Sequence, residues 1–226
     1  MKIINIDQLL KELDKYTFQQ FHIHHTWKPE KKDFNGNNHM RLQESMKNYH
    51  MRTNGWSDIA QHISLFPDGL FVTGRPFNIQ PASIKGWNHK KPLMVEMIGN
   101  FDKGHDKLEG EQLKSLLKII KYFIEKYGQQ SIIFHRDNSP KTCPGTSLDK
   151  LELIRQAIVL DKKEKPLKEV YKVEKIKLDI HNKKKEVEGI VQDGINYVPV
   201  RLLEDLGYKV SWSQANKTVK VEYNDK

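Results

Sequence analysis

Hydrophobic positions near the N-terminus follow a helical period, and those that come next alternate. Apolar side chains at Leu9, Leu10, Leu13 and Tyr16 recur among acids and lysines, which predicts an amphipathic helix. Residues 21–26, with the sequence FHIHHT, then alternate between two faces, as expected of a strand. The first, third and fifth of these residues share one face, and the three between them share the other.

A hairpin and a further strand are predicted next along the chain. Residues 63–66 and 70–73 are apolar runs on either side of a Pro-Asp-Gly triplet, in which Gly69 can adopt the positive φ that such a turn often needs. Residues 93–98 form another short apolar run around Glu96. These features predict three strands of one sheet.

Two helical patterns enclose the strand at residues 132–134. Apolar side chains recur at helical spacing from residue 113 to residue 127, where Gly128 ends the pattern. A second helix is predicted from about residue 147 to residue 159, burying one apolar face: Leu148, Leu151, Ile154 and Ile158. Alternating strands and helices predict an α/β fold, a mixed central β-sheet flanked by helices, over residues 1–160.

A composition change at residues 161–168 marks a predicted domain boundary. This segment, DKKEKPLK, is charged and interrupted by Pro166, as expected of an exposed linker. Residues 169–226 form a second, small α+β domain, in which residues 194–223 predict a strand, a short helix and two further strands. This region resembles the small stalk-like domain named after the N-terminus of copper amine oxidases. It has only His181 and no cysteine, so the resemblance implies no copper chemistry.

Composition limits the class of protein. A single cysteine excludes an intramolecular disulfide, and the chain has no run of about eighteen apolar residues that would span a membrane. The first thirteen residues lack the uninterrupted apolar stretch of a signal peptide. The formal charge of +9 suits anionic polymers of a bacterial wall as well as nucleic acid, but basic residues are not gathered in one stripe.

Two potential metal ligands lie in one short loop. His135 directly follows the strand at residues 132–134, and Cys143 lies eight residues later, with Pro140 and Pro144 favouring a return of the chain. Taken alone, such a cysteine is more often a small buried hydrophobe. A third ligand is available at His24, with His25 as the alternative if the first strand has already ended. Three protein ligands with an open fourth position are typical of a catalytic Zn2+, which activates water.

The order of these motifs resembles a known enzyme family. HHT, then WSDI at residues 56–59, PDG, the Val95-Glu96 pair and HRDNSPKTCPG are similar to zinc-dependent N-acetylmuramoyl-L-alanine amidases of the peptidoglycan-recognition and phage-lysozyme type, over residues 18–158. The resemblance implies hydrolysis of the amide between muramic acid and L-alanine. It also implies that the first histidine of HHT, His24, holds the metal.

The same resemblance suggests roles for other residues. Glu96 matches a catalytic glutamate, and Lys141 matches a lysine that stabilises the transition state. Several relatives carry a tyrosine where this chain has Gln61, whose amide can donate a hydrogen bond but cannot act as an acid or base. Gln61 is therefore a candidate substrate binder, together with Trp87, Asn88 and the neighbouring His89, which are expected to line the cleft.

The predicted partner is bacterial peptidoglycan, with anionic wall polymers and self-association through the second domain as further options. The lack of a signal-peptide pattern in the given sequence suits an endolysin that other phage proteins release through the membrane, and it suits equally a sequence that is only part of a longer chain. The rival classes are a non-catalytic peptidoglycan-binding module and a zinc-containing nucleic-acid protein. Cys143, absent from recognition-only relatives, argues against the first, and the lack of a second Cys/His pair or basic stripe argues against the second.

Overall fold

The structure is a computed structural model of the 226-residue chain. It describes residues 1–160, 173–180, 183–192, 195–197, 202–205, 207–213 and 218–223. The chain divides into two compact units, Met1–Leu160 and Asp161–Lys226. The predicted linker at residues 161–168 lies outside the described residues.

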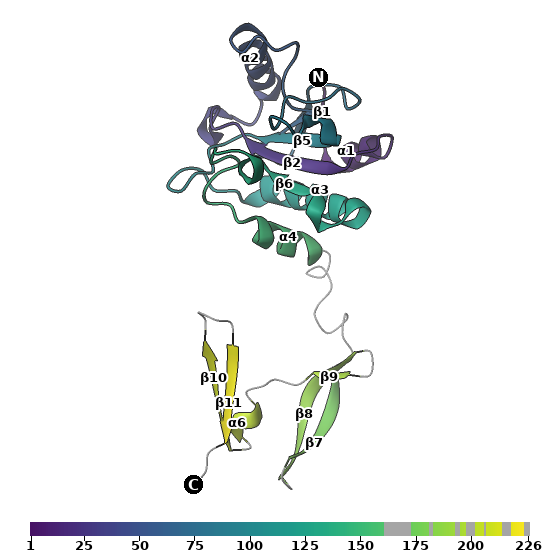
Figure 1. The fold of residues 1–226 in the computed structure, drawn as a ribbon, viewed down its shortest axis with the longest axis vertical. Coiled ribbons are helices and arrows are strands. Elements are labelled where there is room, and N and C mark those ends of the chain that lie inside the picture. Colours follow the sequence, from purple (N-terminus) through teal and green to yellow (C-terminus); the bar gives the residue numbers. More distant parts are fainter. Residues whose placement is uncertain are drawn as a thin grey trace. The chain divides into compact units, whose positions relative to one another are not determined.

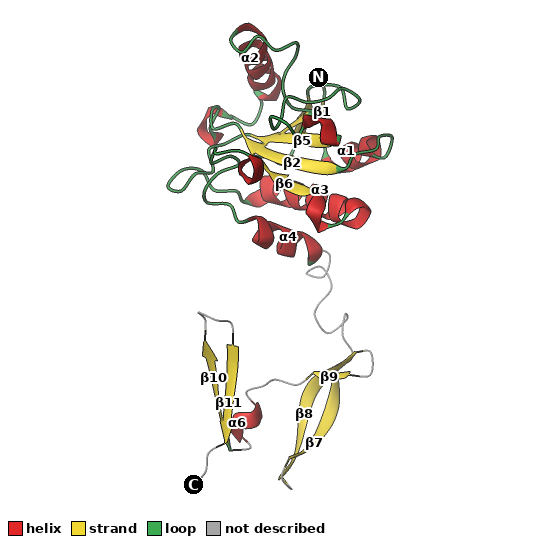
Figure 2. Ribbon diagram, viewed as in Figure 1, coloured by secondary structure: helices red, strands yellow, loops and turns green. Residues whose placement is uncertain are grey.

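A six-stranded mixed sheet forms the centre of the first unit (Figure 2). Its strands, in spatial order, are β1 (Ile3–Ile4), β4 (Phe71–Thr73), β3 (Ile63–Leu65), β5 (Pro92–Met97), β2 (Gln20–His25) and β6 (Ile132–Phe134). The three strands β5, β2 and β6 run parallel, as does the β3–β5 pair, while β4 is antiparallel to both of its neighbours. The predicted mixed sheet flanked by helices is confirmed.

Helices cover both faces of this sheet (Figure 1). The α-helices of the unit are α1 (Ile6–Leu13), α2 (His39–Arg52), α3 (Gly110–Tyr127) and α4 (Lys150–Ile158), and the short 3-10 helices are η1 (Lys31–Asp33), η2 (Asn88–Lys90), η3 (Gln129–Ser131) and η4 (His135–Asn138). One hydrophobic core joins α1, α3 and α4 to inward-facing strand residues such as Phe21, Ile23 and Val95. A smaller core lies under α2, with Val72 from the other side of β4.

Local sequence signals account for most element ends. The hairpin between β3 and β4 turns at Gly69, whose φ is +83°, and α3 ends at Gly128, whose φ is +80°. Helix α2 is not indicated by the hydrophobic pattern because few apolar side chains, chiefly Leu42 and Met46, face the core.

Helix α4 differs from the prediction in the face that it buries. It begins at Lys150 and buries Leu153, Ile154 and Ala157. Leu151 is 72% exposed and Ile158 is 40% exposed, so the prediction that both are buried was wrong. The helix is oriented so that the stripe containing Leu153 and Ala157, four residues apart, faces α3 and the core. Leu151 and Ile158 lie outside this stripe.

The described part of the second unit is rich in strands. It contains β7 (Val173–Ile180), β8 (Lys183–Gln192) and β9 (Ile195–Tyr197) in one antiparallel sheet, and β10 (Tyr208–Ser213) paired with β11 (Thr218–Tyr223) in another. The short helix α6 (Leu202–Asp205) comes between β9 and β10. This order of strand, helix and two strands agrees with the predicted small domain.

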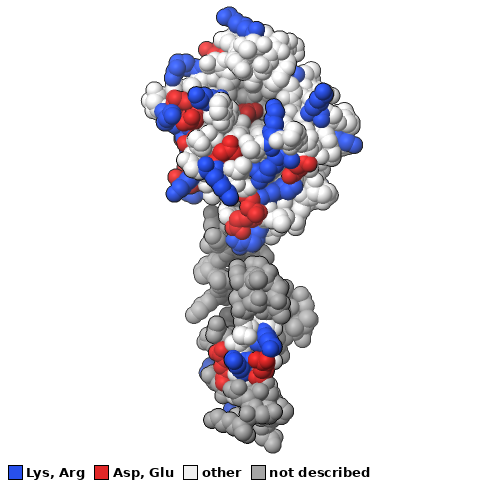
Figure 3. Space-filling view, turned by 60° about the vertical axis from the view of Figure 1, so that its left-hand side comes forward, with Lys and Arg blue, Asp and Glu red and all other residues white. Residues whose placement is uncertain are grey.

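Charged side chains of both signs are mixed on one face of residues 1–160. On the face in Figure 3, lysines and arginines are interspersed with acidic side chains. Within the part of the chain that the structure describes, no helix is both long and apolar enough for a membrane crossing.

Candidate metal centre and cleft

Three potential metal ligands meet at one edge of the sheet. His24 lies near the carboxyl end of β2, and His135 directly follows β6, the parallel neighbour of β2. Because carboxyl ends of parallel strands meet at the same edge, both imidazoles reach the same place. Cys143 returns to it from the following loop, and the ligand atoms of the three residues all lie within 4.8 Å of one another.

The return loop is held by hydrogen bonds from Arg136. Its backbone N–H donates to the carbonyl oxygen of Cys143 over 2.8 Å, and its Nη1 donates to the carbonyl oxygen of Gly145 over 2.6 Å. Gly145 has a φ of +125°, and a Cβ there would overlap the carbonyl group of Phe101. The loop can therefore approach the strand edge only because residue 145 is glycine.

The geometry separates His24 from His25. Nδ1 of His24 lies 3.6 Å from Sγ of Cys143. His25 instead accepts a hydrogen bond at Nδ1 from the backbone N–H of Phe101 over 3.1 Å, and its own backbone N–H donates to Sγ of Cys143 over 3.4 Å. The alternation of the strand puts the two rings on opposite faces of the sheet, so His24 belongs to the cluster and His25 supports it.

This donor set fits a zinc ion. Tetrahedral zinc with Zn–S of about 2.3 Å and Zn–N of about 2.05 Å requires S and N atoms about 3.6 Å apart, which is the distance between Sγ of Cys143 and Nδ1 of His24. Burial holds the pKa of His24 well below its ordinary value, and burial together with Lys141 lowers the pKa of His135 to about 4. Both imidazoles are thus neutral, as metal ligands must be.

The thiol of Cys143 is the ligand that most needs a cation. Burial raises its pKa above the ordinary value, and the nearby Glu96 raises it further. A thiolate at this position is stable only beside a positive charge, because an unpaired ion is costly to bury. A bound metal ion would provide that charge.

Glu96 lies beside His24 in the sheet. The two residues are register partners on the parallel strands β2 and β5, so their side chains project from the same face about 5 Å apart at the backbone. Burial raises the pKa of Glu96 to about 8, against the opposing effect of Lys141. Glu96 and Lys141 both line the cleft that contains the three ligands.

The cleft has a volume of about 1220 Å³, large enough for a polymer segment rather than a small metabolite. Aromatic side chains border it at Trp27, which is 56% exposed, and at Trp56, which is 39% exposed. Ser83 and Lys85 also line the cleft. Of these four, only Trp56 belongs to a motif singled out in the sequence, and no periodic pattern marks the other three.

Two predicted substrate binders do not line the cleft. Gln61 is fully buried and donates from Nε2 to Oγ of Ser64 over 2.8 Å, so it cannot meet a substrate. Trp87 is half-buried and also lies outside the residues that line the cleft.

Asn88 does line the cleft, but its carbonyl oxygen is already engaged. Oδ1 of Asn88 accepts hydrogen bonds from the backbone N–H groups of Ser83 and Ile84, over 3.0 and 2.8 Å. Its observed role is therefore to hold the turn that carries Ser83.

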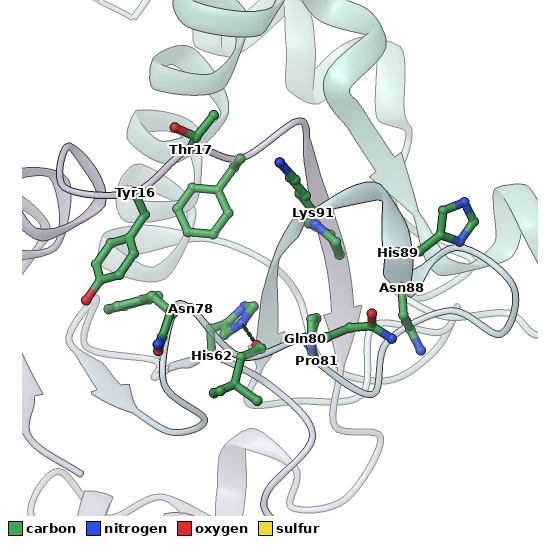
Figure 4. Close-up of a pocket in the computed structure, with 13 residues that line it drawn as sticks. Tyr16, Thr17, His62, Asn78, Gln80, Pro81, Asn88, His89 and Lys91 are labelled. Atoms are coloured by element: carbon green, nitrogen blue, oxygen red, sulfur yellow. Dashed lines mark hydrogen bonds between the residues drawn. The ribbon is translucent and has the colours of Figure 1, made fainter.

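His89 lies in a second, smaller hollow of about 340 Å³ (Figure 4). Tyr16, Phe77 and Lys91 also line this hollow. His62 contributes a buried ring whose Nε2 donates to the carbonyl oxygen of Ile79 over 2.9 Å, drawn as a dashed line in Figure 4. The structure therefore places His89 in this smaller hollow and not among the residues that line the cleft of the three ligands.

Profiles of known protein families match the sequence of both units. The profile of the N-acetylmuramoyl-L-alanine amidase family matches residues 14–146, and that of the copper amine oxidase N-terminal domain matches residues 154–226. Peptidoglycan-recognition protein SC1a of Drosophila melanogaster is 30% identical over 109 residues, which are 46% of this chain and 57% of that protein. The endolysin of Enterobacteria phage T3 is 29% identical over 97 residues, which are 42% of this chain and 64% of that protein. The chain thus spans less than two thirds of the length of these relatives.

Solved structures share the fold of the first unit. The bumblebee peptidoglycan-recognition protein PGRP-SA is 27% identical with a TM-score of 0.50, over 59% of this chain and 79% of that one. N-acetylmuramoyl-L-alanine amidase LysC from Clostridium intestinale has a TM-score of 0.50 at 24% identity, over 64% of this chain and 87% of that one. Since the amidase profile covers more than half of the sequence, the chain belongs to the N-acetylmuramoyl-L-alanine amidase family.

Proposed function

We propose that this protein is a zinc-dependent peptidoglycan hydrolase that cleaves the amide bond between N-acetylmuramic acid and the L-alanine of the stem peptide, as an endolysin does. The observation that carries the proposal is the convergence of His24, His135 and Cys143 in one cleft with Glu96 and Lys141. Family membership and the similarity to phage endolysins agree with it.

His24, His135 and Cys143 would hold the metal. Zinc, when bound, acts as a Lewis acid on the scissile carbonyl and activates a water for attack. The side chains of the cleft carry the rest of the chemistry, since amide hydrolysis needs a proton acceptor, a proton donor for the leaving amine and a positive group for the developing oxyanion.

Glu96 is suited to the proton transfers. A carboxylate oxygen of Glu96 takes the proton of the attacking water and returns it to the nitrogen of L-alanine as the C–N bond breaks. Its pKa, raised to about 8 by burial in the metal-free protein, is close to neutral pH, where a group can both accept and donate a proton.

Lys141 is suited to charge stabilisation. Its Nζ donates a hydrogen bond to the carbonyl oxygen as negative charge builds on it. The lysine is two residues from Cys143, and its charge acts on Glu96 and His135. These electrostatic effects support a position of its ammonium group near Glu96 and His135.

The test is digestion of purified peptidoglycan by the full chain, followed by mass spectrometry. Release of intact stem peptides that begin with free L-alanine is expected, and chelation should abolish it. Glu96→Gln should retain zinc and lower kcat by about two orders of magnitude or more. Binding of peptidoglycan without cleavage by the zinc-loaded protein would instead identify a recognition module, and full activity of protein shown to be metal-free would contradict the mechanism.

A further inference from the structure

A serine hydroxyl connects two histidine rings behind the metal cluster. Oγ of Ser83 lies 2.7 Å from Nε2 of His24 and 2.9 Å from Nδ1 of His22. Ser83 is 59 residues from His24 along the chain, so only the fold brings these groups together. A hydroxyl has one proton to donate and two lone pairs to accept with, so it can donate to only one of the two rings.

Gln20 sets the direction of this chain of hydrogen bonds. Its Oε1, which can only accept, lies 2.9 Å from Nε2 of His22. The fully buried His22 ring has a hydroxyl and an amide as its hydrogen-bond partners among the described residues, which favours the neutral imidazole. Nε2 of His22 therefore carries the proton, and Nδ1 accepts from the hydroxyl of Ser83.

The remaining proton position follows from this order. Because Ser83 donates to His22, its oxygen accepts from Nε2–H of His24. Nδ1 of His24 is then unprotonated, and it is this nitrogen that lies 3.6 Å from Sγ of Cys143. The free lone pair thus points to the side on which a metal would be shared with the thiolate.

Hydrogen bonds and packing fix the position of Ser83. Asn88 accepts hydrogen bonds from the N–H groups of Ser83 and Ile84 and so closes the turn that presents the hydroxyl. Ile84 is fully buried next to it, which anchors the turn on its other side. The hydroxyl is therefore held in place before any metal binds.

We propose that Gln20, His22 and Ser83 form a directed hydrogen-bond chain that locks His24 as the Nε2–H tautomer and so presents Nδ1 as the metal donor. Ser83 and His22 are positioning residues, since they act through His24. Groups of this kind typically contribute about 10- to 100-fold to metal affinity. The inference rests on the zinc site of the proposed function, but it concerns three residues to which the sequence motifs gave no role.

The first measurement is the tautomer of His24 in the zinc-free full chain, from long-range ¹H–¹⁵N correlation spectra. His24 is expected to be protonated at Nε2. His62, which donates from Nε2 to Ile79 and accepts at Nδ1 from the backbone N–H of Met94, provides an internal reference for that tautomer. A proton on Nδ1 of His24 would mean that the hydrogen bonds run in the opposite direction, and it would overturn the proposal.

The second measurement is zinc affinity by competition with a chromophoric chelator. Ser83→Ala should weaken zinc binding about 10- to 100-fold and allow both tautomers of His24, whereas Ser83→Thr, which keeps the hydroxyl, should restore most of the affinity. Ser115→Ala is the matched control, because it removes a buried hydroxyl that donates to Gly69 in the hairpin loop. It should leave zinc affinity unchanged.

A variant at the other end of the hydrogen-bond chain tests the proposal independently, in case Ser83→Ala does not fold. Gln20 is only partly buried at the start of β2, so Gln20→Met should fold while removing the acceptor that sets the direction. It should mix the tautomers of His24 and weaken zinc binding. Wild-type zinc affinity in folded Ser83→Ala would refute this inference alone, whereas a wild-type chain that binds no zinc would refute the metal site itself and this inference with it.

Discussion

Replacement of Glu96 by glutamine should stabilise the zinc-free protein, and the gain should depend on pH. Burial raises the pKa of Glu96 from an ordinary 4.5 to about 8. The folded protein therefore holds this proton at neutral pH, while the unfolded chain releases it. Between pH 4.5 and 8, folding takes up a proton, so the free energy of unfolding falls as the pH rises through that window.

The size of the effect follows from the same shift. A pH of 7 is 2.5 units above the ordinary pKa of 4.5, and at 1.36 kcal/mol per unit the burial of this carboxyl lowers the free energy of unfolding of the wild type by about 3 kcal/mol. Glutamine has nearly the same shape and does not ionise in this pH range. The free energy of unfolding of Glu96→Gln should therefore exceed that of the wild type by up to about 3 kcal/mol at pH 7. At pH 5 the difference should fall below about 1 kcal/mol.

Guanidinium chloride unfolding at the two pH values measures this difference. Tryptophan fluorescence is a suitable signal, since three of the four tryptophans, Trp27, Trp56 and Trp87, lie in the first unit. The exposed Glu44 on α2 offers a matched control, because Glu44→Gln should change stability by less than about 0.5 kcal/mol at either pH. A pH-independent difference, or equal stability of wild type and Glu96→Gln at pH 7, would refute the argument from burial.

Four further predictions concern the cluster, its loop and the second unit. Cys143→Ala should lose both zinc and activity, measured by metal analysis and peptidoglycan digestion, because it removes the one thiolate ligand. Lys141→Ala should keep zinc but lower kcat about 100-fold in the same digestion, since no ligand is lost while the positive charge is. Gly145→Ala should cost about 2 to 4 kcal/mol in urea unfolding and weaken zinc binding, because its Cβ overlaps Phe101 at a positive φ; wild-type stability would contradict the packing argument. A chain of residues 1–160 should hydrolyse soluble muropeptides as the intact chain does but cosediment less well with cell walls, and loss of soluble turnover would mean that the second unit helps to build the active site.

Local sequence signals determined the elements of the fold and part of the site. Alternation in FHIHHT, the Pro-Asp-Gly turn and the apolar stripe of α3 act over a few residues, so they predict strands and helices without knowledge of the rest of the chain. The ligand set could also be anticipated, because His24, His135 and Cys143 lie in motifs whose order resembles an enzyme family. Sequence alone left His24 and His25 as alternatives.

Tertiary structure decided which side chains meet. The choice of His24 depends on Phe101 occupying Nδ1 of His25, a contact across 76 residues. The placement of Ser83 between two histidine rings likewise depends on segments far apart in the chain. Such contacts leave no periodic trace, because the hydrophobic pattern records only whether a side chain faces the core, and not which polar group it meets there.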